Sequence, residues 1–206
     1  MMPLLSRRGL VLPLAAALAA CGNPLSRPYP EKQIFVLRVP REAPRDPIAR
    51  PRLLLMRDVD AAPGVEARGL VTRLDESRQQ TDFWNEFALP PARLVDEQLR
   101  RWLDASGAVS AVLDGGSRAR SDVVLEPTLT ALYADATDPR HPAAQVTLAV
   151  LLLDASRSPP RLVAQETISQ RVALANTEPA TVVAGMNTAL ASIFARIEML
   201  LRTLRI

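Results

Sequence analysis

The sequence contains only one cysteine, Cys21, and one histidine, His141. A single thiol cannot form a disulfide within the chain, so the fold has to rest on its hydrophobic core. The usual nitrogen and sulfur ligands of a metal site are missing for the same reason. His141 stands between Pro139 and Pro142, a context that predicts an exposed loop. These scarcities exclude a disulfide scaffold and a zinc-type centre.

Catalytic motifs are equally scarce. No serine has a histidine close by in a recognisable motif, and no glycine-rich phosphate loop occurs. The carboxylate pairs Asp75-Glu76 and Asp96-Glu97 could in principle do acid–base work, but adjacent residues on a helix point apart. We therefore expect Asp96 and Glu97 to form a solvated helix face. The sequence predicts a protein that is not an enzyme and that holds no cofactor and no metal.

A dense basic run with interleaved aromatic residues is also absent. The whole chain has a formal charge of +3, but Arg7 and Arg8 belong to an N-terminal segment that we expect to be removed. Without them, 23 of the 25 basic residues remain against 22 acidic ones. A nearly neutral chain has no electrostatic footprint for a phosphate backbone, so nucleic acid is excluded as a partner.

The N-terminus has the form of a secretory signal. Arg7 and Arg8 supply its positive charge, and the stretch 10–20 is apolar and free of charge. It is too short to span a bilayer, which needs about 20 residues. The run Leu18-Ala19-Ala20-Cys21 looks like a bacterial lipobox, in which the cysteine is acylated and becomes the first mature residue. The competing interpretation is an ordinary secretory signal with an incidental buried cysteine.

We therefore predict a signal peptide at 1–20, a lipidated tether at 21–33 and a folded domain at 34–206. Gly22, in place of an aspartate after Cys21, resembles the sorting pattern for the outer membrane, which puts the domain on its periplasmic face. The run from Ser6 to Val11 also resembles a twin-arginine export signal, so the export route stays open. The proline-rich stretch 23–33 is typical of an extended tether.

Within the domain, the hydrophobic pattern predicts an α+β fold. Two helices are expected, at 91–105 and, much longer, at 179–204, where apolar residues recur every three or four positions. Alternating or short apolar runs predict a mostly antiparallel sheet on which both helices pack. Its expected strands are 34–39, 52–59, 69–75, 108–113, 122–133, 145–153 and part of 161–174, with 76–87 undecided. In 122–133 the inward face is expected to carry Val123, Leu125, Leu129, Ala131 and Tyr133.

Aromatic residues make up only 4% of the chain, and several of them cluster. Phe83, Trp84 and Phe87 directly precede the proline-capped helix at 91–105. For Trp84 and for Trp102 on that helix, we favour packing over a ligand platform. Phe83, Trp84 and Phe87 together are the candidate interaction patch, and Cys21 is the candidate lipidation site.

Taken in order, these stretches resemble the ABC-type transport auxiliary lipoprotein family, the PqiC-like proteins. The likeness rests on the lipobox, the short run Ile34-Phe35-Val36-Leu37, the run Gly69-Leu70-Val71-Thr72-Arg73, and the segment 83–91 leading into a helix that ends at 101–107. It implies a non-enzymatic outer-membrane partner of an MCE-domain periplasmic protein and its ABC permease and ATPase, in a system that moves lipid between membranes. The family's usual tyrosine near the tryptophan is replaced here by Phe83 or Phe87.

Two other functions remain open at this point. The apolar stripe of the long C-terminal helix could line an acyl-chain groove between helix and sheet, which would make the protein a lipid-binding carrier. A lipopolysaccharide-assembly type lipoprotein would share the anchor and the small α+β domain, but would need a barrel partner. A ring-forming homo-oligomer would suit a docking role, although no residue indicates one.

Overall fold

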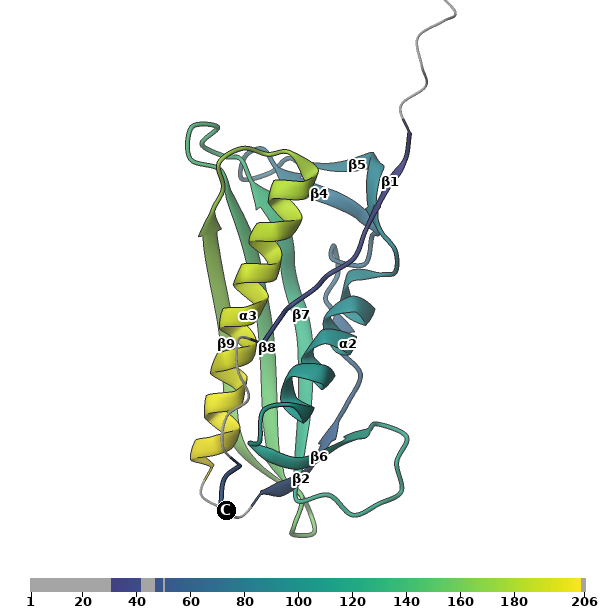
Figure 1. The fold of residues 1–206 in the computed structure, drawn as a ribbon, viewed down its shortest axis with the longest axis vertical. Helices are drawn as coiled ribbons and strands as arrows, with labels where there is room; N and C mark the ends of the chain where they lie inside the picture. Colours follow the sequence, from purple (N-terminus) through teal and green to yellow (C-terminus); the bar gives the residue numbers. More distant parts are fainter. Residues whose placement is uncertain (1–30, 42–46, 50, 205–206) are drawn as a thin grey trace, which may run out of the picture. The chain divides into compact units, whose positions relative to one another are not determined.

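The computed structural model describes residues 31–41, 47–49 and 51–204 (Figure 1). The predicted signal peptide, Cys21 and most of the predicted tether lie outside the described residues. The described chain from Lys32 onward forms a single domain with nine strands and two helices. In chain order these are β1 (Gln33–Phe35), β2 (Arg52–Met56), β3 (Asp60–Ala61), β4 (Gly69–Arg73), β5 (Gln79–Phe87), α2 (Pro91–Asp104), β6 (Val109–Asp114), β7 (Val123–Asp135), β8 (Ala143–Asp154), β9 (Arg161–Ala173) and α3 (Pro179–Thr203).

The three longest strands, β7, β8 and β9, form an antiparallel meander, as their alternating pattern predicts. In β8 every second residue from Val146 to Leu152 is buried, and the others are half-buried. The predicted inward face of β7 is wrong in its second half. The register shifts between Leu129 and Ala131, which turns Leu132 and Ala134 inward in place of Ala131 and Tyr133. An extra residue in a strand reverses the facing of all that follow.

The other edge of β7 is shared by three short strands, all parallel to it. β2 pairs with its beginning, β3 with its middle and β4 with its end. β6 then adds to β2 in parallel, β5 adds to β4 antiparallel, and β1 adds to β5 in parallel. The sheet is thus mostly antiparallel along its length, as predicted, with parallel pairs confined to the short strands.

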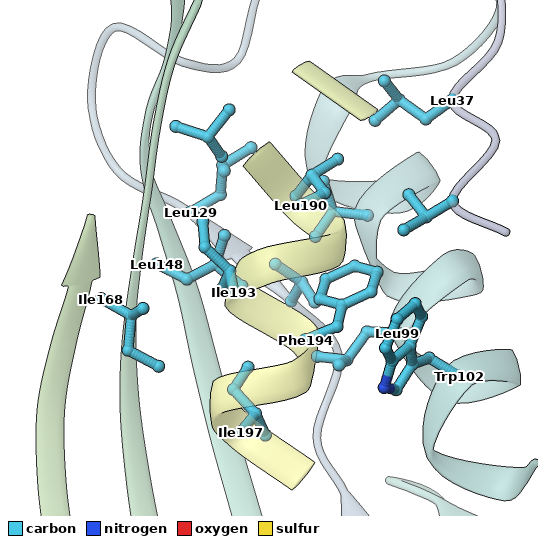
Figure 2. Close-up of a cluster of buried hydrophobic side chains, with 14 of the residues drawn as sticks. Leu37, Leu99, Trp102, Leu129, Leu148, Ile168, Leu190, Ile193, Phe194 and Ile197 are labelled. Atoms are coloured by element: carbon cyan, nitrogen blue, oxygen red, sulfur yellow. The ribbon is translucent and has the colours of Figure 1, made fainter. Parts of the chain in front are cut away.

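Both helices pack on the sheet, and α3 lies along β8 and β9 (Figure 1). Pro91 begins α2, where its missing N–H costs nothing, and Gly107 follows the helix in the left-handed region with φ 67°. The core lies between helices and sheet (Figure 2). There the Phe194 ring of α3 meets the Trp102 ring of α2 edge-on, with 5.8 Å between centroids. Trp102 is a core residue, as predicted.

Among the described residues, α3 alone is long and apolar enough to cross a membrane. Its apolar stripe is instead used by the core, since Met186, Ile193 and Ile197 are fully buried. A helix with one buried apolar face and one polar face is typical of packing on a sheet.

The segment that follows β1 lies across the two helices rather than in the sheet. Leu37 and Val39 are buried, while the backbone N–H of Arg38 donates to Asn187 of α3 and that of Val39 donates to Gln98 of α2, each at 3.0 Å. The predicted strand 34–39 therefore ends at Phe35, because these side chains take the backbone donors that a ladder would use.

Candidate functional site

The predicted aromatic patch lies on a wide bulge in β5. Gly69 pairs with Glu86 and Val71 with Thr81, so four residues of β5, 82–85, stand opposite one residue of β4. We call residues 82–85 the aromatic bulge. A bulge bends its strand and changes the direction in which side chains point.

Asp82 holds the aromatic bulge in shape. Its Oδ1 accepts hydrogen bonds from the backbone N–H groups of Trp84, at 2.8 Å, and Asn85, at 3.1 Å. Its Oδ2 accepts a third bond from the side-chain amide of Asn85, at 2.8 Å. These bonds replace the ladder bonds to β4 that the bulge residues lack.

Gly69 on β4 makes room for the bulge. A Cβ at this position would lie 2.5 Å from Cγ2 of Thr81 and 2.6 Å from the backbone oxygen of Asp82. The second of these atoms belongs to the backbone and cannot move aside. A residue without a side chain is therefore required where the bulge closes on β4.

The three predicted patch residues have different surroundings. Phe83 is 72% exposed, Trp84 is half-buried, and Phe87 is only 2% exposed and belongs to the core. The rings of Phe83 and Trp84 meet edge-on with 5.0 Å between centroids. Phe87 is thus a packing residue, and the candidate contact surface is carried by Phe83 and Trp84.

Charged residues surround the exposed ring. The ammonium nitrogen of Lys32 lies 5.4 Å from the Phe83 centroid and 2.9 Å from Oε2 of Glu86. Arg68 contacts the other carboxylate oxygen of Glu86 at 2.7 Å. The hydrogen bond from Lys32 and the charge of Arg68 hold the pKa of Glu86 below its usual value. Two cations, Lys32 and Arg68, and two carboxylates, Glu86 and Asp82 of the bulge, balance the formal charge of this surface. Ile34, which is paired with Glu86 and 60% exposed, adds an apolar side chain.

A second polar cluster, which the sequence did not indicate, is centred on Glu198 of α3. Its side chain is 1% exposed and contacts Arg41 at 2.5 Å and Arg202 at 3.0 Å, and it accepts a bond of 3.1 Å from the indole N–H of Trp102. Burial raises the pKa of Glu198, but the bonds from Arg41, Arg202 and Trp102 outweigh it, so the pKa lies below its usual value. The cluster ties the N-terminal segment to both helices.

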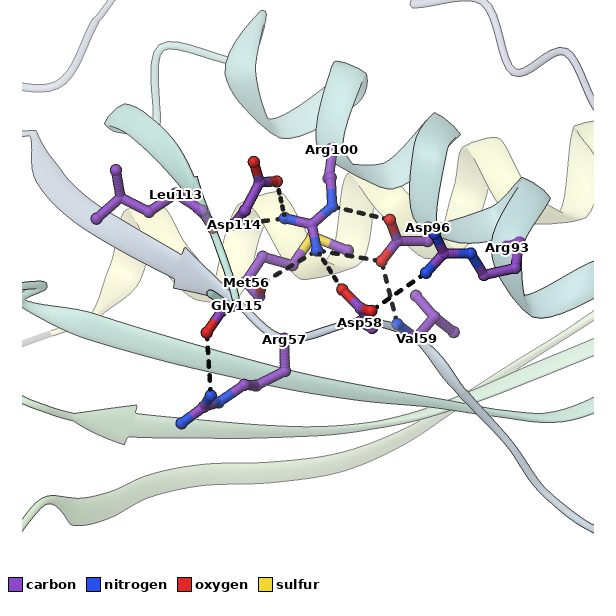
Figure 3. A network of polar contacts seen from close by, with 10 residues as sticks. All are labelled: Met56, Arg57, Asp58, Val59, Arg93, Asp96, Arg100, Leu113, Asp114 and Gly115. Atoms are coloured by element: carbon purple, nitrogen blue, oxygen red, sulfur yellow. Dashed lines mark hydrogen bonds and ion pairs between the residues drawn. The ribbon is translucent and has the colours of Figure 1, made fainter. Parts of the chain in front are cut away.

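The third cluster joins α2 to the ends of β2 and β6 (Figure 3). Arg100 contacts Asp96 at 2.8 Å, Asp58 at 3.3 Å and Asp114 at 3.2 Å, and donates to the backbone oxygen of Met56 at 3.1 Å. Asp96 is buried and accepts the backbone N–H of Val59. The expected solvated face is therefore wrong for Asp96, because Arg100 and the chain after β2 cover it. Each carboxylate of this cluster forms an ion pair with an arginine. The cluster therefore has a structural role, in holding α2 against the strands.

The remaining candidates for chemistry are dispersed. His141 is exposed in the β7–β8 loop, as predicted, and lies 2.8 Å from Asp138. Within 31–41, 47–49 and 51–204 no group of histidine, cysteine and acidic residues is arranged to hold a metal ion.

Buried side chains fill most of the space between α3 and the sheet, and an open pocket of about 540 Å³ lies between the last turns of α3 and the start of β9. A second open groove, of about 650 Å³, lies on α3 beside Arg41 and Trp102. Small residues line it along the helix: Ala184, Thr188, Ala191, Ser192 and Ala195.

Several crystal structures share this fold. Protein XCC0632 from Xanthomonas campestris, of the DUF330 family, has a TM-score of 0.71 at 23% sequence identity, covering 81% of this chain and 92% of that one. An uncharacterized protein has a TM-score of 0.64 at 16% identity, with 82% and 97% covered. The hypothetical protein CT253 from Chlamydia trachomatis has a TM-score of 0.51 at 13% identity, with 74% and 98% covered.

No protein-family model matches the chain. No curated protein matches it either. At these sequence identities the likeness to the crystal structures establishes the fold alone. The fold is an α+β domain like that of XCC0632. In this chain a bulge in β5 carries an exposed aromatic residue, Phe83.

Proposed function

We propose that this chain is a non-enzymatic, lipid-anchored protein on the periplasmic face of the bacterial outer membrane. Its task is to dock the MCE-type periplasmic protein of an ABC-type lipid transport system at that membrane. The anchor is the acylated Cys21, and the tether runs from there to Glu31, shorter than the predicted 21–33 because Gln33 already lies in β1. The proposal combines the lipobox and the family resemblance of the sequence with the surface of the domain.

The observation that carries the proposal is the aromatic bulge. Exposed Phe83 adds nothing to the core, yet two residues shape the bulge that carries it. Asp82 accepts the N–H groups of the bulge, and Gly69 leaves room for it on β4. Large exposed apolar side chains on a shaped surface are typical of interaction sites. Glu198 on α3 and Asp96 on α2, the buried carboxylates of the two helices, are both bound by arginines, so the chemistry of the described residues favours contact over catalysis.

The experiment is purification of the full-length protein from its native membranes in mild detergent, followed by mass spectrometry of the co-eluting proteins. A Cys21→Ala variant, which cannot be acylated, is the matched control. We expect an MCE protein with its ABC permease and ATPase to accompany the wild type, and the intact mass of the wild type to include the acyl chains. Wild-type protein that is acylated but elutes without any of these subunits would contradict the docking function.

One observation favours a second function. The open groove on α3 could hold an acyl chain, which would make the protein a lipid carrier. Native mass spectrometry of the same preparation decides between the two, since a carrier would retain phospholipid at a fixed stoichiometry. Co-elution of an outer-membrane barrel would instead indicate a lipopolysaccharide-assembly role.

A further inference from the structure

We infer that the aromatic bulge contacts the lipid surface of the membrane to which the chain is anchored. This inference takes only the lipid anchor from the proposed function. It names lipid as the partner of the surface formed by Lys32, Ile34, Phe83 and Trp84. The bulge would then serve docking by holding the domain in one orientation at the membrane, and the periplasmic protein would contact another part of the domain.

The position of the tether is the first argument. Ten residues lead from Cys21 to Glu31, and they reach at most about 35 Å when fully extended. As a flexible chain they would hold their ends about 20 Å apart on average. The first residue of the domain, Lys32, lies against the Phe83 ring. The aromatic bulge is therefore next to the point at which the chain leaves for the membrane.

The attachment of this exit point is the second argument. β1 is paired with β5 beside the bulge, and the segment after it is bound to both helices through Asn187, Gln98 and Glu198. The start of the domain cannot turn away from Phe83 without breaking these bonds. A short tether on a fixed exit point holds one surface of the domain near the lipid, and that surface carries the exposed ring.

The composition of the surface is the third argument. Phe83 and Ile34 are apolar and exposed, Trp84 is half-buried beside them, and Lys32 and Arg68 are cationic. Aromatic side chains at the depth of the headgroups, with lysine or arginine reaching the phosphates, are typical of membrane interfaces. Lys32 is the only lysine of the chain. Glu86 and Asp82 offset the formal charge of the two cations, so the contact rests on the apolar side chains, with Lys32 and Arg68 placed to reach lipid phosphates.

The test places a tryptophan at the bulge and another at the opposite end of the sheet. Phe83→Trp reports on the bulge, and Leu162→Trp is the matched control, because Leu162 is also exposed, at 50%, but lies at the start of β9. The full-length acylated proteins are incorporated into vesicles of phosphatidylethanolamine and phosphatidylglycerol, with or without bromine on the acyl chains. Each variant is compared with wild type, so that the signals of Trp84 and Trp102 are subtracted.

We expect the added tryptophan of Phe83→Trp to shift its emission to the blue in vesicles and to be quenched by bromine, while that of Leu162→Trp stays unquenched. Equal quenching of both variants, or of neither, in protein that floats with the vesicles would overturn the inference and leave the anchor intact. Quenching that disappears when the co-purified periplasmic protein is present would overturn it in favour of a protein contact. Protein that does not float at all would count against the anchor, and hence against the proposed function itself.

Discussion

The two halves of the sheet are built by different means. β7, β8 and β9 have 12 or 13 residues each and pair along their whole length with one register shift in each pair, and α3 packs on β8 and β9. β1 to β6 have two to nine residues each, and three of them share one edge of β7. The regular half supplies the scaffold, whereas the irregular half carries the bulge that exposes Phe83. β7 is long enough to pair with β2, β3 and β4 on one edge. Because β7 holds these short strands in place, their pairing with other strands can be irregular.

The largest effect should come from the core that joins the halves. Phe194 is fully buried and packs against Trp102, so Phe194→Ala should lower the free energy of unfolding by about 4 kcal/mol. Urea unfolding followed by circular dichroism measures it. A loss no larger than that of an exposed substitution would mean that α3 is not the centre of the core.

The second-largest loss of stability should come from removing the buried carboxylate of Glu198. Glu198→Gln removes the buried charge that Arg41 and Arg202 both contact and should cost about 3 kcal/mol at neutral pH. Glu97→Gln, on an exposed pair with Arg101, is the matched control and should cost less than about 0.5 kcal/mol.

This effect should depend on pH. Because the pKa of Glu198 is lower in the folded protein than its ordinary value of 4.5, the carboxylate stabilises the fold above that pH. Its contribution is lost as the pH falls through the folded-state pKa. The difference in urea midpoint between wild type and Glu198→Gln should therefore be constant near neutrality and shrink below about pH 4.5. A difference that grows on acidification would show the opposite pKa shift.

A substitution of Gly69 tests how the bulge packs on β4 in the irregular half of the sheet. Gly69→Ala should cost about 2 kcal/mol, because its Cβ would overlap the backbone oxygen of Asp82. Gly116→Ala is the matched control, since no atom lies within 4 Å of a Cβ there. Equal thermal midpoints for the two variants would show that the bulge does not close on β4.

The smallest of these effects concerns the bonds within the bulge. Asp82→Ala removes the acceptor for two backbone N–H groups and should cost about 1 kcal/mol. Amide hydrogen exchange should quicken at Trp84 and Asn85, while β8 stays protected. Unchanged exchange at both residues would mean that the bulge holds its shape without Asp82.

Long elements could be predicted from the sequence because their periodicity is repeated many times. α3 and the three-stranded meander have the expected positions, although β9 extends over Arg161–Ala173 where only part of that stretch was expected to be a strand. The parallel attachment of β2, β3 and β4 to β7 could not be predicted, since two to five residues carry no signal about their partner. The shift at Thr130 and the burial of Asp96 likewise depend on contacts with residues far away in the sequence.

The sequence located the candidate site as a cluster of aromatic residues, but it did not distinguish the contact residue Phe83 from the packing residue Phe87. On a regular strand Phe83 and Phe87, four positions apart, would share a face. The bulge separates them, so that Phe83 is exposed and Phe87 enters the core. The turn-forming residues Asp82 and Asn85 within a strand pattern, and Gly69 on the neighbouring strand, were the available signals. The Glu198 cluster had only a weak local signal, the i,i+4 spacing of Glu198 and Arg202, because Arg41 and Trp102 come from distant segments.

The most direct test of the account compares Phe83→Ala with Phe87→Ala, the same substitution on the same strand. We expect Phe87→Ala to lose about 3 to 5 kcal/mol of the free energy of unfolding. Phe83→Ala should stay within about 0.5 kcal/mol of wild type and still float with vesicles, while an environment-sensitive dye on Lys32 no longer reports contact with lipid. A large loss of stability in Phe83→Ala, or unchanged contact of the dye with lipid, would contradict the division between a packing and a contact residue.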